Sequence, residues 1–104
     1  MFELTKRQID VLETLAENKR AYVMREYDRK ANTVKGGALV FAGPGGAVIR
    51  ADRLSKVTIN ALTVRPLLKV VKCIVAQTIV INHFVLSPAG LKFLREREQK
   101  RKER

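Results

Sequence analysis

Hydrophobic positions near the start of the chain follow the period of an amphipathic helix. Residues three or four apart form one apolar stripe that ends near Asn18, and these are Ile9, Leu12, Leu15 and Ala16. The segment from Thr5 to Gln8 has the sequence of a capping box, in which the threonine hydroxyl and the glutamine side chain satisfy the first free backbone amides. The sequence therefore predicts a first helix that begins after Thr5.

The pattern changes from helical spacing to alternation after Arg20. Residues 22–27 alternate, and residues 38–41 and 47–50 are short runs with the composition of strands. Two segments between them, Lys30 to Gly37 and Gly43 to Gly46, are rich in residues that favour turns. We expect a β-hairpin or a small meander in this region.

Helical spacing returns around residues 58–72. The apolar residues Leu62, Val64, Leu67, Leu68 and Val71 fit one side of a helix. Pro66 limits where this helix begins, because a proline beyond the first turn removes a hydrogen bond and clashes with the preceding carbonyl. The expected cap is Thr63, with Asn60 as the alternative.

The last third of the chain predicts a hairpin and then a helix. Residues 73–86 are rich in β-branched side chains, with a turn near Gln77 and Thr78 or near Asn82. Ser87 and Pro88 are a typical helix start, and Leu91, Phe93 and Leu94 are expected to anchor that helix. We expect one domain over residues 1–95, followed by a charged, frayed tail over residues 96–104.

Composition adds a partner class to this α+β pattern. A chain of 104 residues with 46% hydrophobic residues builds one core, and its net charge of +11 favours a polyanionic partner. Nucleic acid is the first expectation, and an anionic membrane is second. Residues 1–18 carry two basic and four acidic residues, so the first helix is not expected to face DNA.

The single cysteine and the longest uncharged segment indicate the cellular compartment in which the protein is expected. Cys73 excludes an internal disulfide and fits a reducing interior, and its apolar neighbours predict a core thiol. The uncharged run from Cys73 to Leu91 is interrupted by polar residues and proline, so it is a poor membrane span, and no signal peptide is visible. A soluble cytoplasmic protein is expected.

Residues with catalytic or metal-binding chemistry are few. The glycines at 43, 45 and 46 lack the lysine and hydroxyl residue of a P-loop, so a hairpin turn is the better interpretation. His83 is the only histidine and has no neighbouring ligand or base in sequence, which favours a place on a strand beside Phe84. We expect no enzymatic activity, no metal and no cofactor.

Three segments together resemble winged helix-turn-helix DNA-binding regulators. They are Leu4 to Leu12, Thr63 to Leu68 and Leu86 to Leu91, which look like that family's first helix, recognition helix and helix restart after the wing. The resemblance implies a winged-helix-like domain with a β-hairpin insertion after the first helix and a C-terminal helix. The chain departs from the family where this insertion replaces the second helix and where the wing lacks glycine and basic residues.

The resemblance and the charge together predict a regulator of transcription that reads double-stranded DNA with a helix near residues 58–72. Short polar and basic side chains on and before that helix are the expected contacts, with Arg65 the best candidate for a base because its planar fork can pair with guanine. The predicted DNA-binding residues are Arg53, Lys56, Thr58, Asn60, Thr63, Arg65, Lys69 and Lys72.

Two further partners remain open. The apolar residues of 79–85 cannot all face inward from a two-stranded wing, so a third strand or a second chain should cover them, and we hypothesise a homodimer through this sheet or the first helix. The order of elements, with Leu68, Lys69 and Lys72, is also similar to a small bacterial family of toxin-like proteins that inhibit DNA topoisomerase I. That similarity implies a protein target in place of DNA. Nonspecific RNA binding is disfavoured because the aromatic residues are few and are not arranged as stacking pairs.

Overall fold

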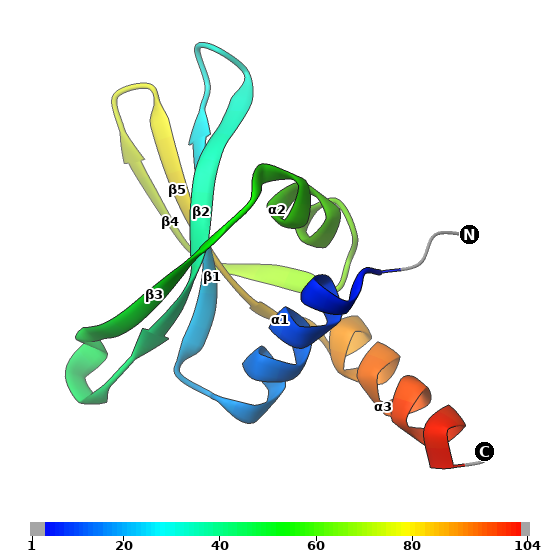
Figure 1. The fold of residues 1–104 in the computed structure, drawn as a ribbon. Helices are drawn as coiled ribbons and strands as arrows, with labels where there is room; N and C mark the ends of the chain where they lie inside the picture. Colours follow the sequence, from blue (N-terminus) through cyan, green and yellow to red (C-terminus); the bar gives the residue numbers. More distant parts are fainter. Residues whose placement is uncertain (1–3, 103–104) are drawn as a thin grey trace.

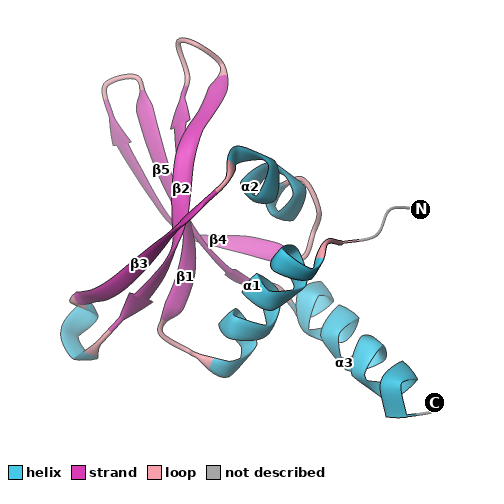
Figure 2. Cartoon of the chain, in the orientation of Figure 1, coloured by secondary structure: helices cyan, strands magenta, loops and turns pink. Residues whose placement is uncertain are grey.

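The chain folds as an α+β domain in which helices cover one side of a single antiparallel sheet (Figures 1 and 2). The computed structural model describes residues 4–102. Its elements in chain order are α1 (Lys6–Glu17), β1 (Ala21–Asp28), β2 (Thr33–Ala42), the short 3-10 turn η1 (Pro44–Gly46), β3 (Val48–Leu54), α2 (Lys56–Thr63), β4 (Leu68–Ala76), β5 (Ile79–Leu86) and α3 (Pro88–Lys102).

The first helix begins with the capping box that the sequence predicts. The Thr5 hydroxyl accepts from the backbone N–H of Gln8 at 3.2 Å, and the Gln8 side-chain oxygen accepts from the backbone N–H of Thr5 at 3.0 Å. Asn18 is the C-terminal cap. The buried stripe differs from the prediction, because Gln8 and Val11 are also buried, Ile9 is half-buried and Ala16 is exposed.

The middle of the chain is the predicted meander, with a shorter first turn. Strand β2 already begins at Thr33, so the turn is confined to residues 29–32, where Asn32 has a φ of 53°. Its local side-chain bonds, from the backbone N–H groups of Lys30 and Ala31 to the Asp28 carboxylate, close the turn early. The glycine-rich turn is confirmed, and Gly45 and Gly46 both have positive φ angles there.

The sheet joins the meander to the C-terminal hairpin. Its strand order is β3-β2-β1-β5-β4, and every neighbouring pair is antiparallel. The hairpin turns at Gln77 and Thr78, one of the two predicted positions. Since β5 pairs with β1 over Val23↔Phe84 to Asp28↔Ile79, β1 is the third strand that the apolar hairpin required.

The core lies between the sheet and two of the helices. Leu12 on α1, Ile59 and Leu62 on α2, and Val23 on β1 have no exposed surface. The cross-strand pairs Val23↔Leu39 and Val23↔Phe84 place their side chains on this same covered face. Alternation sends the intervening residues to the opposite face, which no helix of the described residues covers (Figure 1).

The prediction of a helix over residues 58–72 is wrong in its boundaries. Helix α2 begins after Ser55, whose hydroxyl accepts from the backbone N–H of Thr58, and Thr63 is its last residue instead of its cap. Proline disfavours the helical conformation of the residue before it, so Pro66 favours the end of a helix. The spacing of apolar residues instead predicts the start of a helix near this proline. Residues 68–76, including Lys69 and Lys72, are on strand β4.

Cys73 is exposed, so the prediction of a core thiol is also wrong. Its apolar neighbours resemble a core segment, but β4 is the last strand of the sheet. All its residues from Lys69 to Ala76 are exposed. An edge strand has no further strand beside it, and the helices reach only its first residue, Leu68, which is buried.

The C-terminal helix starts at Pro88, as predicted. The Ser87 hydroxyl accepts from the backbone N–H of Gly90 at 3.1 Å and donates to the carbonyl of Pro66, which ties the helix start to the loop after α2. Gly90 packs so closely against the Leu67 carbonyl that a Cβ atom would collide with it. Phe93 and Leu94 pack against the core, whereas Leu91 is exposed and is not an anchor. The predicted charged tail lies on α3 as far as Lys102, and its last two residues lie outside the described part.

Candidate nucleic-acid interface

The outer side of α2 carries side chains that the core does not use. The inner side of the helix buries Thr58, Ile59 and Leu62 against the sheet and α1. On the other side, Val57 and the C-cap residue Val64 are 74% and 77% exposed, and Asn60 is exposed between them. Because residues three, four and seven apart share one side of a helix, these three residues form a stripe, which we call the α2 stripe.

Two of the predicted contact residues on α2 use their side chains for hydrogen bonds within the helix. Thr58 is buried, and its hydroxyl accepts from the Ser55 hydroxyl at 2.9 Å. The Thr63 hydroxyl donates to the carbonyl of Ile59 at 2.8 Å. Ser55 and Thr58 fix the start of the helix, so their side chains position α2 instead of reaching outward.

A basic groove adjoins the start of α2. It has a volume of about 600 Å³, and its lining includes Arg53, Lys56 and Lys35, together with Glu26. The predicted residues Arg53 and Lys56 are therefore brought together. Lys35 was not predicted, and no local signal could have identified it, because only the pairing of β2 with β3 brings Gly37 opposite Leu54 and so places Lys35 there.

The remaining predicted residues lie elsewhere. Lys69 and Lys72 are exposed on β4, where their register partners are Val85 and His83 on the uncovered face of the sheet. Arg65 is half-buried in the loop after α2 and lines a small pocket with Pro66 and Phe93. The structure thus separates Lys69 and Lys72 from the residues on α2, while Arg53 lies on the uncovered face of the sheet and also lines the groove at the start of α2.

The segment that carries both groups is free of acidic residues. From Arg53 to Arg95 the sequence has seven lysines and arginines and no aspartate or glutamate. The charges therefore do not neutralise one another within this part of the chain. Basic residues also outnumber the single acidic residue, Glu26, in the groove, and an excess of positive charge attracts a polyanion at long range and raises the rate of encounter.

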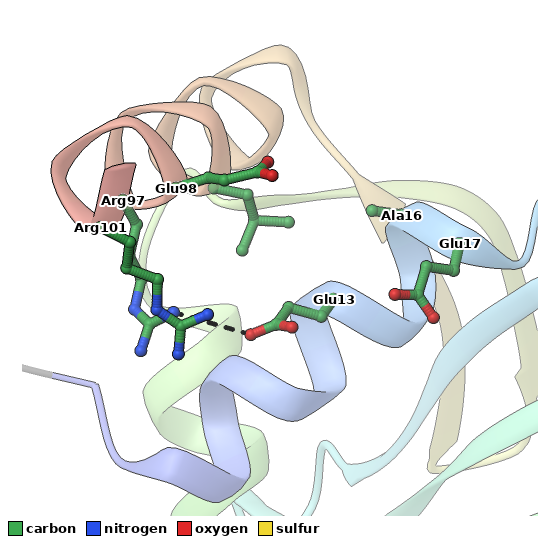
Figure 3. A pocket seen from close by; sticks show the side chains of 7 residues that line it. Glu13, Ala16, Glu17, Arg97, Glu98 and Arg101 are labelled. Atoms are coloured by element: carbon green, nitrogen blue, oxygen red, sulfur yellow. Dashed lines mark ion pairs between the residues drawn. The ribbon is translucent and has the colours of Figure 1, made fainter. Parts of the chain in front are cut away.

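Carboxylates instead gather in a cleft between α1 and α3 (Figure 3). Glu13 pairs with Arg97 at 3.7 Å across the cleft, and Glu17, Glu98 and Arg101 also line it. Charges of both signs alternate there, so the cleft is suited to holding α3 against α1. No group of three or more His, Cys, Asp or Glu within residues 4–102 is placed to bind a metal ion.

His83 occupies the predicted position on a strand beside Phe84. Its ring stacks on that of Tyr22, with centroids 4.3 Å apart and planes inclined by 17°. Burial, and then the charge of Lys72, lower the pKa of His83 below its ordinary value. The expectation that no aromatic stacking pair exists is therefore wrong, since pairing of β1 with β5 brings together two rings that are distant in sequence.

None of the protein families, curated proteins and solved structures compared with this chain matches it. Among the helices described, none has the length and apolar character needed to cross a bilayer.

Proposed function

We propose that the protein binds double-stranded DNA and regulates transcription, with α2 as the recognition helix of a winged-helix-like domain. The order of helix, strands, helix and hairpin supports this proposal, with the β1–β2–β3 meander in place of the family's second helix. The observation that carries it is the α2 stripe, an exposed surface without charge beside a basic groove.

The dimensions of α2 suit the major groove. With its side chains an α-helix is about 10–12 Å across, which fits the major groove of B-DNA, about 12 Å wide. The eight residues of α2 give it a length of about 12 Å. Val57 and Val64 are seven residues apart, which corresponds to about 10 Å along the helix axis. At about 3.4 Å per base pair, the α2 stripe spans about three base pairs.

The side chains of the stripe favour A·T base pairs. An asparagine amide can pair with adenine through two hydrogen bonds, and apolar side chains contact the thymine methyl group. Asn60 is therefore the proposed reader of adenine, and Val57 and Val64 are the proposed thymine contacts. Lys56, Arg53 and Lys35 flank the start of the helix, where they can hold phosphates and fix its orientation.

The test compares duplexes that differ only in their A·T content, using fluorescence anisotropy over a series of salt concentrations. Asn60→Ala should weaken binding to the preferred A·T site by about 1–3 kcal/mol, or about 5- to 150-fold, with little effect on G·C duplexes. Lys56→Gln should weaken all duplexes alike and reduce the salt dependence. Gln99→Ala, an exposed amide on α3, is the matched control. Equal binding of all duplexes by wild type and Asn60→Ala would falsify the assignment of α2.

A second candidate function rests on the same valines. An exposed apolar stripe also fits a hydrophobic groove on a protein, as the resemblance to topoisomerase I inhibitors implies. The relaxation of supercoiled plasmid by a bacterial topoisomerase I separates the two proposals. A direct inhibitor acts at an unchanged molar ratio to the enzyme when competitor DNA is added, whereas a DNA-binding protein loses its effect.

A further inference from the structure

The uncovered face of the sheet, which we call the open face, has its own chemistry. All three α-helices lie on the other side (Figures 1 and 2). Register places one row of residues across all five strands of this face: Lys72, His83, Met24, Ala38 and Arg53. Four strand spacings of about 4.8 Å make this row about 19 Å long, with a cation at each end.

The adjacent positions extend this row. Tyr22 precedes Met24 by two residues on β1, and Lys69 lies opposite Val85 on the β4–β5 ladder. By the alternation of residues along a strand, both side chains lie on the open face, so an aromatic ring and a second lysine lie beside the row. Lys69 and Lys72 are exposed, whereas Tyr22 and His83 are half-buried and keep part of their surfaces accessible to solvent.

The Tyr22–His83 stack is a flat aromatic surface rather than a charged one. Burial and the charge of Lys72 lower the pKa of His83, which favours the neutral imidazole. The two nearly parallel rings come from neighbouring strands, so the sheet fixes their relative position. A prearranged pair of this kind loses little conformational freedom when a third ring stacks on it.

Charge on the open face is separated along the strands. Lys69 and Lys72 flank the aromatic stack, while Glu26 and Asp28 lie toward the other end of β1. The Asp28 carboxylate is engaged by the backbone N–H groups of the following turn at 3.0 and 3.2 Å. Two lysines therefore lie beside the rings, while Arg53 lies at the opposite edge of the open face.

We propose that the open face binds single-stranded nucleic acid, with bases stacked on Tyr22 and His83 and phosphates held by Lys69 and Lys72. Unpaired bases expose their faces to aromatic side chains, and lysines beside them neutralise the backbone. A duplex keeps its bases stacked internally and does not present them to this surface. Arg53 belongs both to the row of the open face and to the lining of the basic groove beside α2. Tyr22, His83, Lys69 and Lys72 do not line that groove, so variants at these four positions test the single-strand proposal separately from the α2 proposal.

The experiment measures anisotropy of labelled oligothymidylate, oligouridylate and duplex DNA, each about 12 nucleotides long, with the purified full-length protein. Tyr22→Leu keeps the apolar bulk but removes the aromatic ring, and it should weaken binding of the single strands at least about fivefold while duplex binding stays unchanged. Tyr22→Phe should bind as wild type. The matched control is Tyr27→Leu, on the same strand but on the covered face.

A tyrosine signal tests the stacking directly. The chain has two tyrosines and no tryptophan, so Tyr22 is the only fluorescent tyrosine in the Tyr27→Phe variant. Its emission should be quenched as oligothymidylate binds. Comparison of the two oligonucleotides shows whether RNA or DNA is preferred, since the stacking chemistry is common to both.

A charge variant keeps the test valid if Tyr22→Leu does not fold. The double variant Lys69→Gln and Lys72→Gln changes only exposed side chains, and it should reduce single-strand affinity at least about tenfold and lower the salt dependence. Lys100→Gln on α3 is its control. Absence of single-strand binding by wild type, or binding by the double variant at the wild-type level, overturns the proposal.

Discussion

Helices α1 and α2 cover the same face of the sheet, but their outer sides differ. Both bury fully enclosed aliphatic side chains, Leu12 on one helix and Leu62 on the other. The outer side of α1 is charged and one of its residues, Glu13, pairs with Arg97 of α3. The outer side of α2 has the exposed valines 57 and 64 and no acidic residue. Solvent and α3 account for the surface of α1, whereas the α2 stripe calls for a partner.

The largest expected losses of stability are the same for the inner sides of α1 and α2. Leu12→Ala and Leu62→Ala should each lower the free energy of unfolding by about 2–5 kcal/mol, because each leaves a cavity at a fully buried position. Urea unfolding followed by circular dichroism measures both. Leu91→Ala on α3, where the side chain is 38% exposed, should cost much less. A loss below about 1 kcal/mol for Leu62→Ala alone means that α2 does not share the core of α1.

Features that the sequence predicts correctly depend on neighbouring residues. Thr5 and Gln8 contact each other three residues apart, and Ser87 bonds to the backbone of Gly90 over the same distance. The glycine-rich turn after Gly43 is similarly local. In each case residues a few positions apart define the feature, so their local sequence is enough to predict it.

Features that the sequence misplaces depend on distant strands. The apolar residues from Leu62 to Val71 fit one helical stripe, but they belong to the end of α2, the loop at Pro66 and the start of β4. Cys73 lies in an apolar run whose exposure is decided by the strand order. Lys35 at the groove and the Tyr22–His83 stack likewise result from register. Periodicity cannot distinguish one long element from two shorter ones in phase.

Removal of the two helix caps should have intermediate and unequal consequences. Thr5→Ala and Ser55→Ala should each lower the free energy of unfolding by about 1 kcal/mol, because each leaves a backbone N–H of the first turn without its acceptor. Only Ser55→Ala should also weaken duplex binding, since it loosens the start of the proposed recognition helix. Urea unfolding and anisotropy on the same preparations separate the two readouts. Equal loss of duplex binding in both variants indicates that α1 contributes to the interface.

The smallest effect on stability should come from the outer side of α2, and it can have the opposite sign. Valine is a weaker helix former than alanine, so Val57→Ala should change the free energy of unfolding by no more than about 0.5 kcal/mol, with any change toward greater stability. The same substitution removes the proposed thymine contact and should weaken A·T duplex binding. Val75→Ala, an exposed valine on β4, should leave duplex affinity unchanged. If the removal of the Val57 side chain stabilises the fold but weakens duplex binding, Val57 belongs to an interface. If duplex affinity is unchanged, Val57 is an ordinary exposed residue, and the outer side of α2, like that of α1, needs no partner.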